Sequence, residues 1–418
     1  MWAASLLLIA PAALASDNGL ALTPPLGWNS WNQFQCNVSD ALIRRQADAM
    51  VSLGLVDLGY QYVVIDDCWQ ADARDVSGRL APDATRFPAG IAALSAYVRS
   101  RGLKLGIYSD VGTKTCAGYP GSFGHYDLDA RTFADWGIDY LKFDTCSLTW
   151  KETLDPRPFY ARRGANMSAA LNATGRPVLY SMCNWGRHDP WLWAPEIANM
   201  WRTTMDVWPQ WHRVASILDS MAGLSAYGGR GGFNDADMVE VGVDSRIFNW
   251  AGMPETNLTE REAAAHFTMW AIMGAPLVLG LDLEAAEQWA LDVVSHAGVL
   301  AVNQDPLAYP GRRVTSDSDA VLGVCLKSRC ASTQVWAKDL SGGRVAVAFL
   351  NAGDAYSQYS SHYGDEAIAV DFDELHIAGR FRARDVWADA DLGAFESSMT
   401  SPAVPPHGAH LVVLAPDP

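Results

Sequence analysis

The 418-residue chain is short of basic residues. It has 31 Lys and Arg against 47 Asp and Glu, which gives a formal net charge of −16. An acidic surface repels nucleic-acid phosphates and anionic lipid headgroups, so we expect neither nucleic acid nor a membrane surface as a partner. Only 19% of the residues are charged and 49% are apolar. This composition indicates a large folded core and excludes a disordered chain.

Patterns that hold a metal ion are missing from the sequence. None of the nine histidines forms an H-x-H pair, and the cysteines are scattered along the chain, unlike the clustered thiolates of zinc sites. We therefore expect no metal and no cofactor. An odd number of cysteines leaves one thiol free or in an intermolecular bond. The seven are Cys36, Cys68, Cys116, Cys146, Cys183, Cys325 and Cys330.

Long hydrophobic runs are missing after the first residues, since no later stretch has the roughly 18 uninterrupted apolar residues of a spanning helix. Residues 1–15 have the pattern of a signal peptide, with an apolar stretch at 6–10 and the A-x-A pattern at 13–15. Their basic region is weak, so a buried N-terminal helix is the alternative. We expect a protein of the secretory pathway (extracellular, vacuolar or lysosomal), in which disulfides are permitted. Four N-glycosylation sequons agree with this route, at Asn37, Asn166, Asn172 and Asn257.

Short apolar runs alternate with amphipathic stretches between residues 20 and 305. Runs such as 62–66 predict buried strands, whereas 40–53, 91–101 and 260–272 have helical periodicity. This alternation predicts an α/β fold with a parallel sheet and right-handed crossovers. Eight candidate strands indicate a closed (β/α)₈ TIM barrel. They lie at 26–28, 62–66, 103–108, 140–144, 178–182, 200–201, 232–234 and 277–281.

After residue 311 the pattern changes to short strands separated by turns, with no convincing helix. This pattern is typical of an antiparallel β-sandwich. We therefore expect a signal peptide at 1–15, a catalytic barrel at 16–311 and a C-terminal antiparallel β domain at 312–418. The predicted strands of this last domain are 321–324, 333–338, 345–350, 367–370 and 410–414.

Acidic and other polar residues gather where the predicted barrel strands end. In such barrels the active site lies at the carboxyl ends of the strands. A single carboxylate there is commonly a helix N-cap, which is the structural alternative for each of them. Carboxylates after four strands, beside Trp, Lys and Arg, instead predict a sugar-binding pocket. The segments are 66–69, 108–110, 142–146, 183–185, 201–206 and 234–238.

One pair of residues suits the cleavage of a glycoside, which needs one ionised and one protonated carboxyl group across the scissile bond. Lys142 precedes Asp144 by two residues on a predicted strand, so both side chains point into the barrel. A nearby ammonium keeps Asp144 ionised, as a nucleophile requires. A structural Lys142–Asp144 ion pair is the alternative.

Seven strings of residues follow one another along the predicted barrel: PLGWNSW at 25–31, GYQY at 59–62 leading to IDDCW at 65–69, LGIY at 105–108, YLKFD at 140–144, WR at 201–202, NDADM at 234–238 and AVNQD at 301–305. In this order they resemble glycoside hydrolase family 27, the group of α-galactosidases and α-N-acetylgalactosaminidases. The resemblance extends over the barrel from residue 20 to about 306, whereas the C-terminal domain is similar only in position and strand content.

The resemblance implies a retaining exo-glycosidase that hydrolyses terminal non-reducing α-D-galactose by double displacement, with Asp144 as nucleophile and Asp206 as acid/base. The expected partner is a small molecule or oligosaccharide with terminal α-galactose; no oligomeric state is indicated. The implied sugar-binding residues are Trp31 under the apolar face of the sugar, Asp66 and Asp67 at the 4- and 6-hydroxyls, Lys142 at the 3- and 4-hydroxyls, Cys183, Trp185 and Arg202 near the 2-hydroxyl, and Tyr108, Asp237 and Met238 lining the pocket.

The resemblance also implies disulfides Cys36–Cys68 and Cys116–Cys146, which would brace loops at the strand ends. Cys325 and Cys330 could close a small loop, which leaves Cys183 as the free thiol. Asn184 stands where many relatives have Glu, and Met205 where they have small residues, so both bear on leaving-group preference. The segment 147–160 matches no family string, and we expect a surface loop rather than a lid.

Three alternatives remain open. An α-N-acetylgalactosaminidase would need room for an acetamido group at C2, where Cys183 and the bulky Trp185 are expected. Specificity for arabinopyranose would usually replace one of the paired aspartates, and both Asp66 and Asp67 are present. A non-catalytic galactose-binding protein on the same scaffold would lack one catalytic carboxylate.

Overall fold

The computed structural model describes residues 18–147, 156–247, 257–316, 333–353 and 364–417. The predicted signal peptide, the predicted strand 321–324, and Cys325 with Cys330 lie outside these residues. Most of the segment 147–160, for which we expected a surface loop, also lies outside them. Its last residues belong to helix α5 (Pro156–Ala173).

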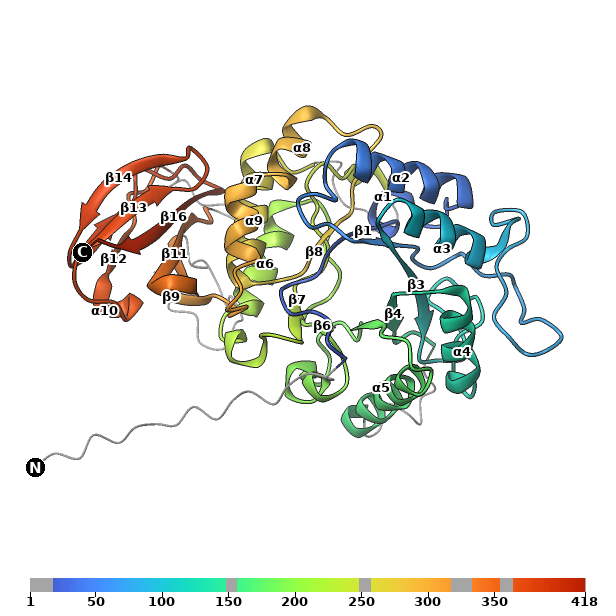
Figure 1. Cartoon of the computed structure of the whole chain (residues 1–418). Coiled ribbons are helices and arrows are strands. Elements are labelled where there is room, and N and C mark those ends of the chain that lie inside the picture. Colours follow the sequence, from blue (N-terminus) through green and yellow to red (C-terminus); the bar gives the residue numbers. More distant parts are fainter. Residues whose placement is uncertain (1–17, 148–155, 248–256, 317–332, 354–363, 418) are drawn as a thin grey trace, which may run out of the picture.

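Eight parallel strands form a single curled sheet in the order β7-β6-β5-β4-β3-β2-β1-β8 (Figure 1). Beyond β7, Val239 forms a parallel bridge to Leu279, and its N–H donates to the carbonyl of Val278 at 2.8 Å. This contact joins the two ends of the sheet, as the predicted (β/α)₈ barrel requires. The strands are β1 (Leu26–Asn29), β2 (Tyr62–Val64), β3 (Lys104–Asp110), β4 (Tyr140–Asp144), β5 (Leu179–Met182), β6 (Met200–Arg202), β7 (Phe233–Asp235) and β8 (Leu277–Leu279).

Helices surround the sheet, and their ends follow local sequence signals. The N-cap Thr259 and Glu262 form a capping box at the start of α7, and this helix ends at Gly274 with φ 67°, where glycine is not strained. Besides α5 and α7 (Glu260–Met273), the helices are α1 (Trp31–Phe34), α2 (Asp40–Ser52), α3 (Gly90–Ser100), α4 (Tyr126–Trp136), α6 (Trp211–Met221), α8 (Gln288–Val294) and α9 (Ala297–Asn303).

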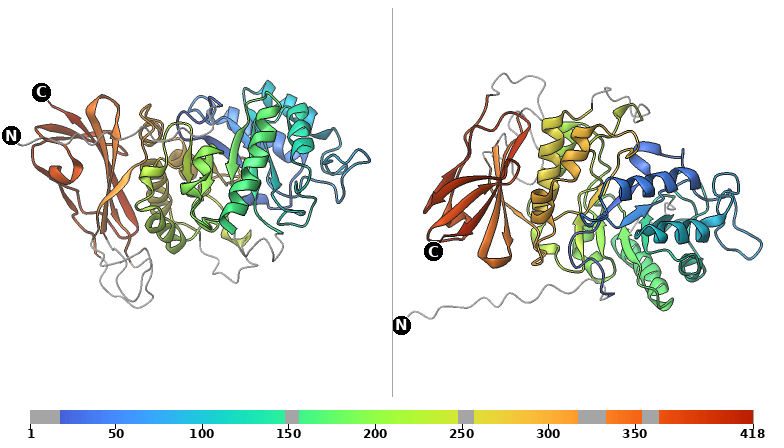
Figure 2. Two further views of the ribbon diagram at one scale, coloured as in Figure 1. Left: turned by 90° about the horizontal axis from the view of Figure 1, so that it is seen from below. Right: turned by 45° about the horizontal axis from the view of Figure 1, so that its top comes forward.

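The C-terminal part is a six-stranded antiparallel sheet in the order β14-β13-β16-β11-β10-β9, with a two-stranded sheet β12-β15 (Figure 2). This confirms the predicted antiparallel β domain, although three strands after residue 380 were not predicted and one helical turn, α10, interrupts it. The elements are β9 (Arg312–Ser316), β10 (Thr333–Leu340), β11 (Arg344–Asn351), β12 (Ala369–Asp371), α10 (Phe372–Leu375), β13 (Phe381–Asp385), β14 (Ala390–Phe395), β15 (Ser398–Thr400) and β16 (Gly408–Pro416).

Strands β10 and β11 of the large C-terminal sheet are buried on both faces. Val335 and Val347 point into the core of the β domain, whereas their neighbours Trp336 and Ala348 belong to the core shared with the barrel, as the two-residue period of a strand dictates. Helix α7 packs on this second face. The sheet therefore packs on the outside of the barrel, against helix α7.

Candidate active site

Five of the predicted sugar-binding residues line one small cavity inside the barrel. They come from β4, β6 and the segments directly after β5 and β7, which are far apart in sequence. They meet in space because parallel strands bring their carboxyl ends to one edge. Asn29, Ser181 and Asp235 also line the cavity. The five predicted residues are Lys142, Cys183, Arg202, Asp237 and Met238.

Lys142 forms an ion pair with Asp66. Lys142 Nζ lies 2.7 Å from Asp66 Oδ2, to which Asn29 Nδ2 also donates at 2.8 Å. Burial lowers the pKa of Lys142, but the charges of Asp66 and Asp144 outweigh it and raise the pKa overall. Lys142 is thus a permanent cation between two carboxyl groups, and its hydrogen bond goes to Asp66.

Asp67 points to the neighbouring loop 111–123. Its Oδ2 accepts the N–H of Ala117 at 2.8 Å, and its Oδ1 accepts the N–H of Cys68 at 2.7 Å. Burial raises the pKa of Asp67 in spite of these donors. The loop after β3 therefore holds this carboxyl group in place.

Asp144, at the end of β4, is only 5% exposed. The hydroxyl of Tyr108 donates to its Oδ2 at 3.2 Å, and the N–H of Thr145 donates to its Oδ1 at 2.8 Å. Burial raises the pKa of Asp144 to about 6; the ammonium of Lys142 opposes this rise, and the charge of Asp206 adds to it. The charge of Asp206 therefore acts on Asp144.

Arg202 joins the remaining acids. Its Nη2 lies 3.0 Å from Asp206 Oδ1 and 2.7 Å from Asp237 Oδ2, and its Nη1 lies 3.7 Å from the sulfur of Cys183. The side chain of Asp206 is 60% exposed, against 4% for Arg202. The two candidate catalytic carboxyl groups thus differ in environment: Asp144 is enclosed, whereas Asp206 faces solvent.

Two of the predicted aromatic residues, Trp31 and Trp185, are not among the residues that line the cavity, whereas Tyr108 is buried beside Asp144. Trp31 begins helix α1 and is half-buried, and its backbone N–H donates to Asn29 Oδ1 at 2.8 Å. Trp185 is half-buried in a turn with φ 54°, and the guanidinium of Arg187 lies 4.8 Å from its ring centroid. Asn184 is fully buried and donates to the carbonyl of Arg187, so its amide closes the turn that presents Trp185.

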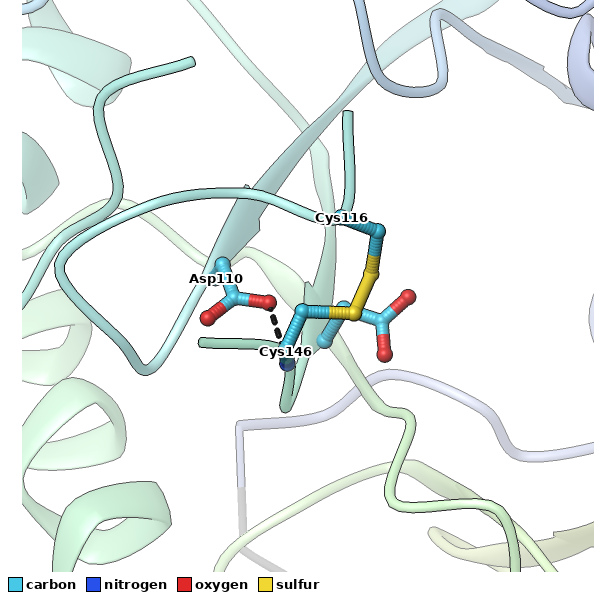
Figure 3. A group of neighbouring side chains, drawn as sticks. Asp110, Cys116 and Cys146 are labelled. Atoms are coloured by element: carbon cyan, nitrogen blue, oxygen red, sulfur yellow. Dashed lines mark hydrogen bonds between the residues drawn. A yellow bond between two sulfur atoms is a disulfide. The ribbon is translucent and has the colours of Figure 1, made fainter. Parts of the chain in front are cut away.

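Both disulfides implied by the resemblance, Cys36–Cys68 and Cys116–Cys146, are bonded, and Cys183 is a buried free thiol. Figure 3 shows the second disulfide beside Asp110. One ligand atom each of Asp110, Asp144 and the two cysteines lies within 4.8 Å of the others, which is close enough for a metal site. The sulfurs are joined to each other, however, so neither is a thiolate.

Asp110 was not among the predicted site residues. It is fully buried, and its two oxygens accept the N–H groups of Gly112 and Cys146 at 2.6 and 2.7 Å. Burial and the charge of Asp144 raise the pKa of Asp110 to about 8. The group in Figure 3 therefore fastens the loop after β3 to the strand end that bears Asp144. The available sequence signal was its place at a strand end, directly after Tyr108.

A parallel barrel whose strand ends converge on buried carboxyl groups, one ammonium and one guanidinium defines a (β/α)₈-barrel glycoside hydrolase. Residues 23–305 match the family model for alpha galactosidase A, and residues 331–414 match the model for the alpha galactosidase C-terminal beta sandwich domain. The chain therefore belongs to the α-galactosidases of glycoside hydrolase family 27.

Individual relatives agree over nearly the whole chain. The alpha-galactosidase of Coffea arabica is 42% identical over 400 residues, which is 96% of this chain and 95% of that protein. The alpha-galactosidase of Cyamopsis tetragonoloba is 40% identical over 405 residues, 96% and 88% of the two chains. The crystal structure of alpha-galactosidase I from Mortierella vinacea matches with a TM-score of 0.83 at 35% identity, over 96% of this chain and 98% of that one. Within the described residues, no helix is long and apolar enough to cross a membrane.

Proposed function

We propose that this protein hydrolyses terminal non-reducing α-D-galactosides with retention of configuration, by double displacement. Asp144 attacks the anomeric carbon, while Asp206 protonates the leaving oxygen and then activates water. The observation that carries this assignment is the unequal exposure of the two carboxyl groups, since Asp144 is 5% exposed and the side chain of Asp206 is 60% exposed. An enclosed carboxylate suits the attack on the bound sugar, and an exposed one suits proton exchange with the leaving group and with water.

The surroundings of Asp144 support the role of nucleophile. The ammonium of Lys142 and the hydroxyl of Tyr108 favour its anion, and the N–H of Thr145 fixes the second oxygen. Arg202, bonded to both Asp206 and Asp237, holds the acid/base by one oxygen. In this scheme Asp206 keeps its other oxygen for the leaving group.

The sugar-binding roles follow from the same contacts. Asp66 and Lys142 hold the 4-hydroxyl and its neighbours through charge-assisted hydrogen bonds, and Asp67, fixed by Ala117, holds the 6-hydroxyl. Trp31 covers the apolar face of the sugar. The solved α-galactosidase of Saccharomyces cerevisiae with raffinose, 29% identical with a TM-score of 0.82, supports an oligosaccharide as substrate.

The packing near the 2-hydroxyl supports galactose rather than N-acetylgalactosamine. Gly186 has φ 73°, and a Cβ there would lie 2.0 Å from the carbonyl oxygen of Thr203. The turn that presents Trp185 is therefore pressed against the segment that leads to Asp206. We infer that Trp185, whose ring centroid lies 4.8 Å from the guanidinium of Arg187, and Cys183 leave the C2 side without space for an acetamido group.

Two measurements test the proposal. During hydrolysis of p-nitrophenyl α-galactoside, NMR should show α-galactose as the first product, before mutarotation; β-galactose first would overturn retention. Turnover of the matched α-N-acetylgalactosaminide should be slower by orders of magnitude, and comparable turnover would overturn the role of Trp185. Binding of galactosides without turnover would favour the non-catalytic alternative.

We also propose secretion after removal of residues 1–15. The two bonded disulfides support an oxidising compartment, as do the four sequon asparagines, all exposed. Intact mass and N-terminal sequencing of protein from a eukaryotic secretion host test this proposal. A mature chain that begins at Met1 would contradict it.

A further inference from the structure

Helix α1, which carries Trp31, is docked on the segment that follows β7. Three amide side chains make this contact. Asn32 Nδ2 donates to Glu240 Oε1, Gln35 Nε2 donates to the carbonyl of Ile247 at 2.8 Å, and Gln33 Oε1 accepts the N–H of Asp244 at 3.3 Å. Of these three bonds, the one between Asn32 and Glu240 joins two buried side chains.

Glu240 is a fully buried acid without a cationic contact among the described residues. Its own N–H donates to Nε2 of His266 at 2.9 Å, so this nitrogen carries no proton and the imidazole is neutral. His266 is also fully buried, and its ring centroid lies 4.1 Å from that of Trp270. Glu240 Oε2 and His266 Nδ1 have no hydrogen-bond partner in the described part of the chain.

If Glu240 were ionised, its negative charge would not be balanced by a cation in contact with it among the described residues. The charged groups that act on Glu240 are Asp237, which opposes its ionisation, and Arg202, which favours it but is bonded to Asp237 and Asp206. Burial, the largest effect, raises the pKa of Glu240 well above its usual value and lowers the pKa of His266 to about 3. Glu240 is therefore a neutral acid that offers Oε1 as a hydrogen-bond acceptor.

We propose that Glu240 is a positioning residue for the Trp31 platform and acts through its neutral hydrogen bond with Asn32. Trp31 is held from two sides. On one side, the backbone N–H of Trp31 donates to Asn29 Oδ1, and Asn29 Nδ2 donates to the sugar-binding Asp66. On the other side, Asn32 lies between Glu240 and Gly280. A Cβ added at Gly280 would lie 3.1 Å from the Cβ of Asn32. Loss of the Glu240 contact frees the second side and lets the indole ring tilt.

This inference rests on the proposed role of Trp31, and its test includes that role. Glu240→Ala should weaken product inhibition by galactose and raise KM about 5- to 10-fold with kcat nearly unchanged, because a platform binds ground state and transition state alike. Glu240→Gln keeps the acceptor oxygen and the neutral charge, so the galactose Ki should stay within about twofold of the wild-type value. Trp31→Ala should raise the Ki at least as much as Glu240→Ala.

Asn32→Ala removes the other partner of the same bond. Its effect on Ki should match that of Glu240→Ala, and the double variant should be no worse than the weaker-binding single variant. If Glu240→Ala does not fold, Asn32→Ala and Glu240→Gln carry the test. Asp305→Asn, which removes a buried acid bonded to Ser341 and Arg344 of the β domain, is the control for stability: it should lower Tm without changing Ki.

The outcomes separate the two proposals. If Trp31→Ala leaves the galactose Ki unchanged, the platform role itself fails. If Trp31→Ala weakens binding but Glu240→Ala lowers only Tm, Glu240 is merely structural and this inference is overturned. If Glu240→Gln is as impaired as Glu240→Ala, the neutral hydrogen bond is not the means by which Glu240 acts.

Discussion

In the proposed mechanism the two sides of the scissile bond have different surroundings. On the galactose side, Asp66 and Asp144 are buried, and each accepts at least two hydrogen bonds. On the leaving-group side, Asp206 is 60% exposed and Met205 is 48% exposed. If this proposal holds, the enclosed sugar site recognises a single terminal residue and the open side tolerates many leaving groups. The predictions below test this difference, from the largest expected effect to the smallest.

The largest difference should appear between the two catalytic carboxyl groups. Asp144→Asn removes the nucleophile, so kcat should fall by about 10⁴-fold or more for every substrate. Asp206→Asn removes a proton donor worth about 10²–10⁴-fold, and the first step should survive with a dinitrophenyl leaving group, which needs little protonation. Steady-state and burst kinetics with dinitrophenyl α-galactoside and raffinose measure both variants.

Azide provides the control for these roles. It needs no general base, so it should rescue Asp206→Asn and give an α-galactosyl azide, because azide displaces Asp144 from the opposite face of the sugar. If azide instead rescues Asp144→Asn with a β-azide product while Asp206→Asn does not respond, the two roles are reversed.

A substitution of Asp110 tests how strongly catalysis depends on the position of the loop after β3. Both of its oxygens accept backbone N–H groups, and an asparagine amide can accept only one of them. Asp110→Asn should therefore displace the loop after β3 and lower kcat/KM by up to about 100-fold, the cost of a misplacement of roughly 1 Å. Equal losses with dinitrophenyl and natural leaving groups are expected, since Asp206 is untouched. A loss confined to natural leaving groups would contradict this view.

Much of this arrangement could be predicted from the sequence, and the limits are informative. The (β/α)₈ barrel follows from β-branched runs alternating with helical periodicity, and the acids at strand ends, such as Asp66 and Asp237, follow from chain position alone. Asp110 and Glu240 could not be predicted, because their importance lies in N–H groups and amides supplied by other loops. Strands β13–β15 were missed because exposed polar residues break their apolar pattern.

Lys142 should set the pH at which the enclosed carboxyl group becomes active. Asp144 must be ionised to attack, and its pKa of about 6 includes a lowering by the Lys142 ammonium. Lys142→Met removes this lowering, so the pKa rises and the acidic limb of kcat/KM should move to higher pH by about one unit or more. Lys142→Arg keeps the charge and should leave the limb in place although KM rises. A limb that moves equally in both variants would assign it to another group.

The smallest effect is expected at Met205, on the open side. The Nε of Arg213 donates to the carbonyl of Asp206 at 2.7 Å, so truncation of the neighbouring side chain should not move the acid/base. Met205→Ala should change kcat/KM for p-nitrophenyl α-galactoside less than about twofold, but lower it about two- to fivefold for raffinose, whose larger leaving group can contact this apolar surface. The galactose Ki should stay constant. If Met205→Ala weakens galactose binding instead, Met205 belongs to the enclosed sugar pocket and not to the open leaving-group side.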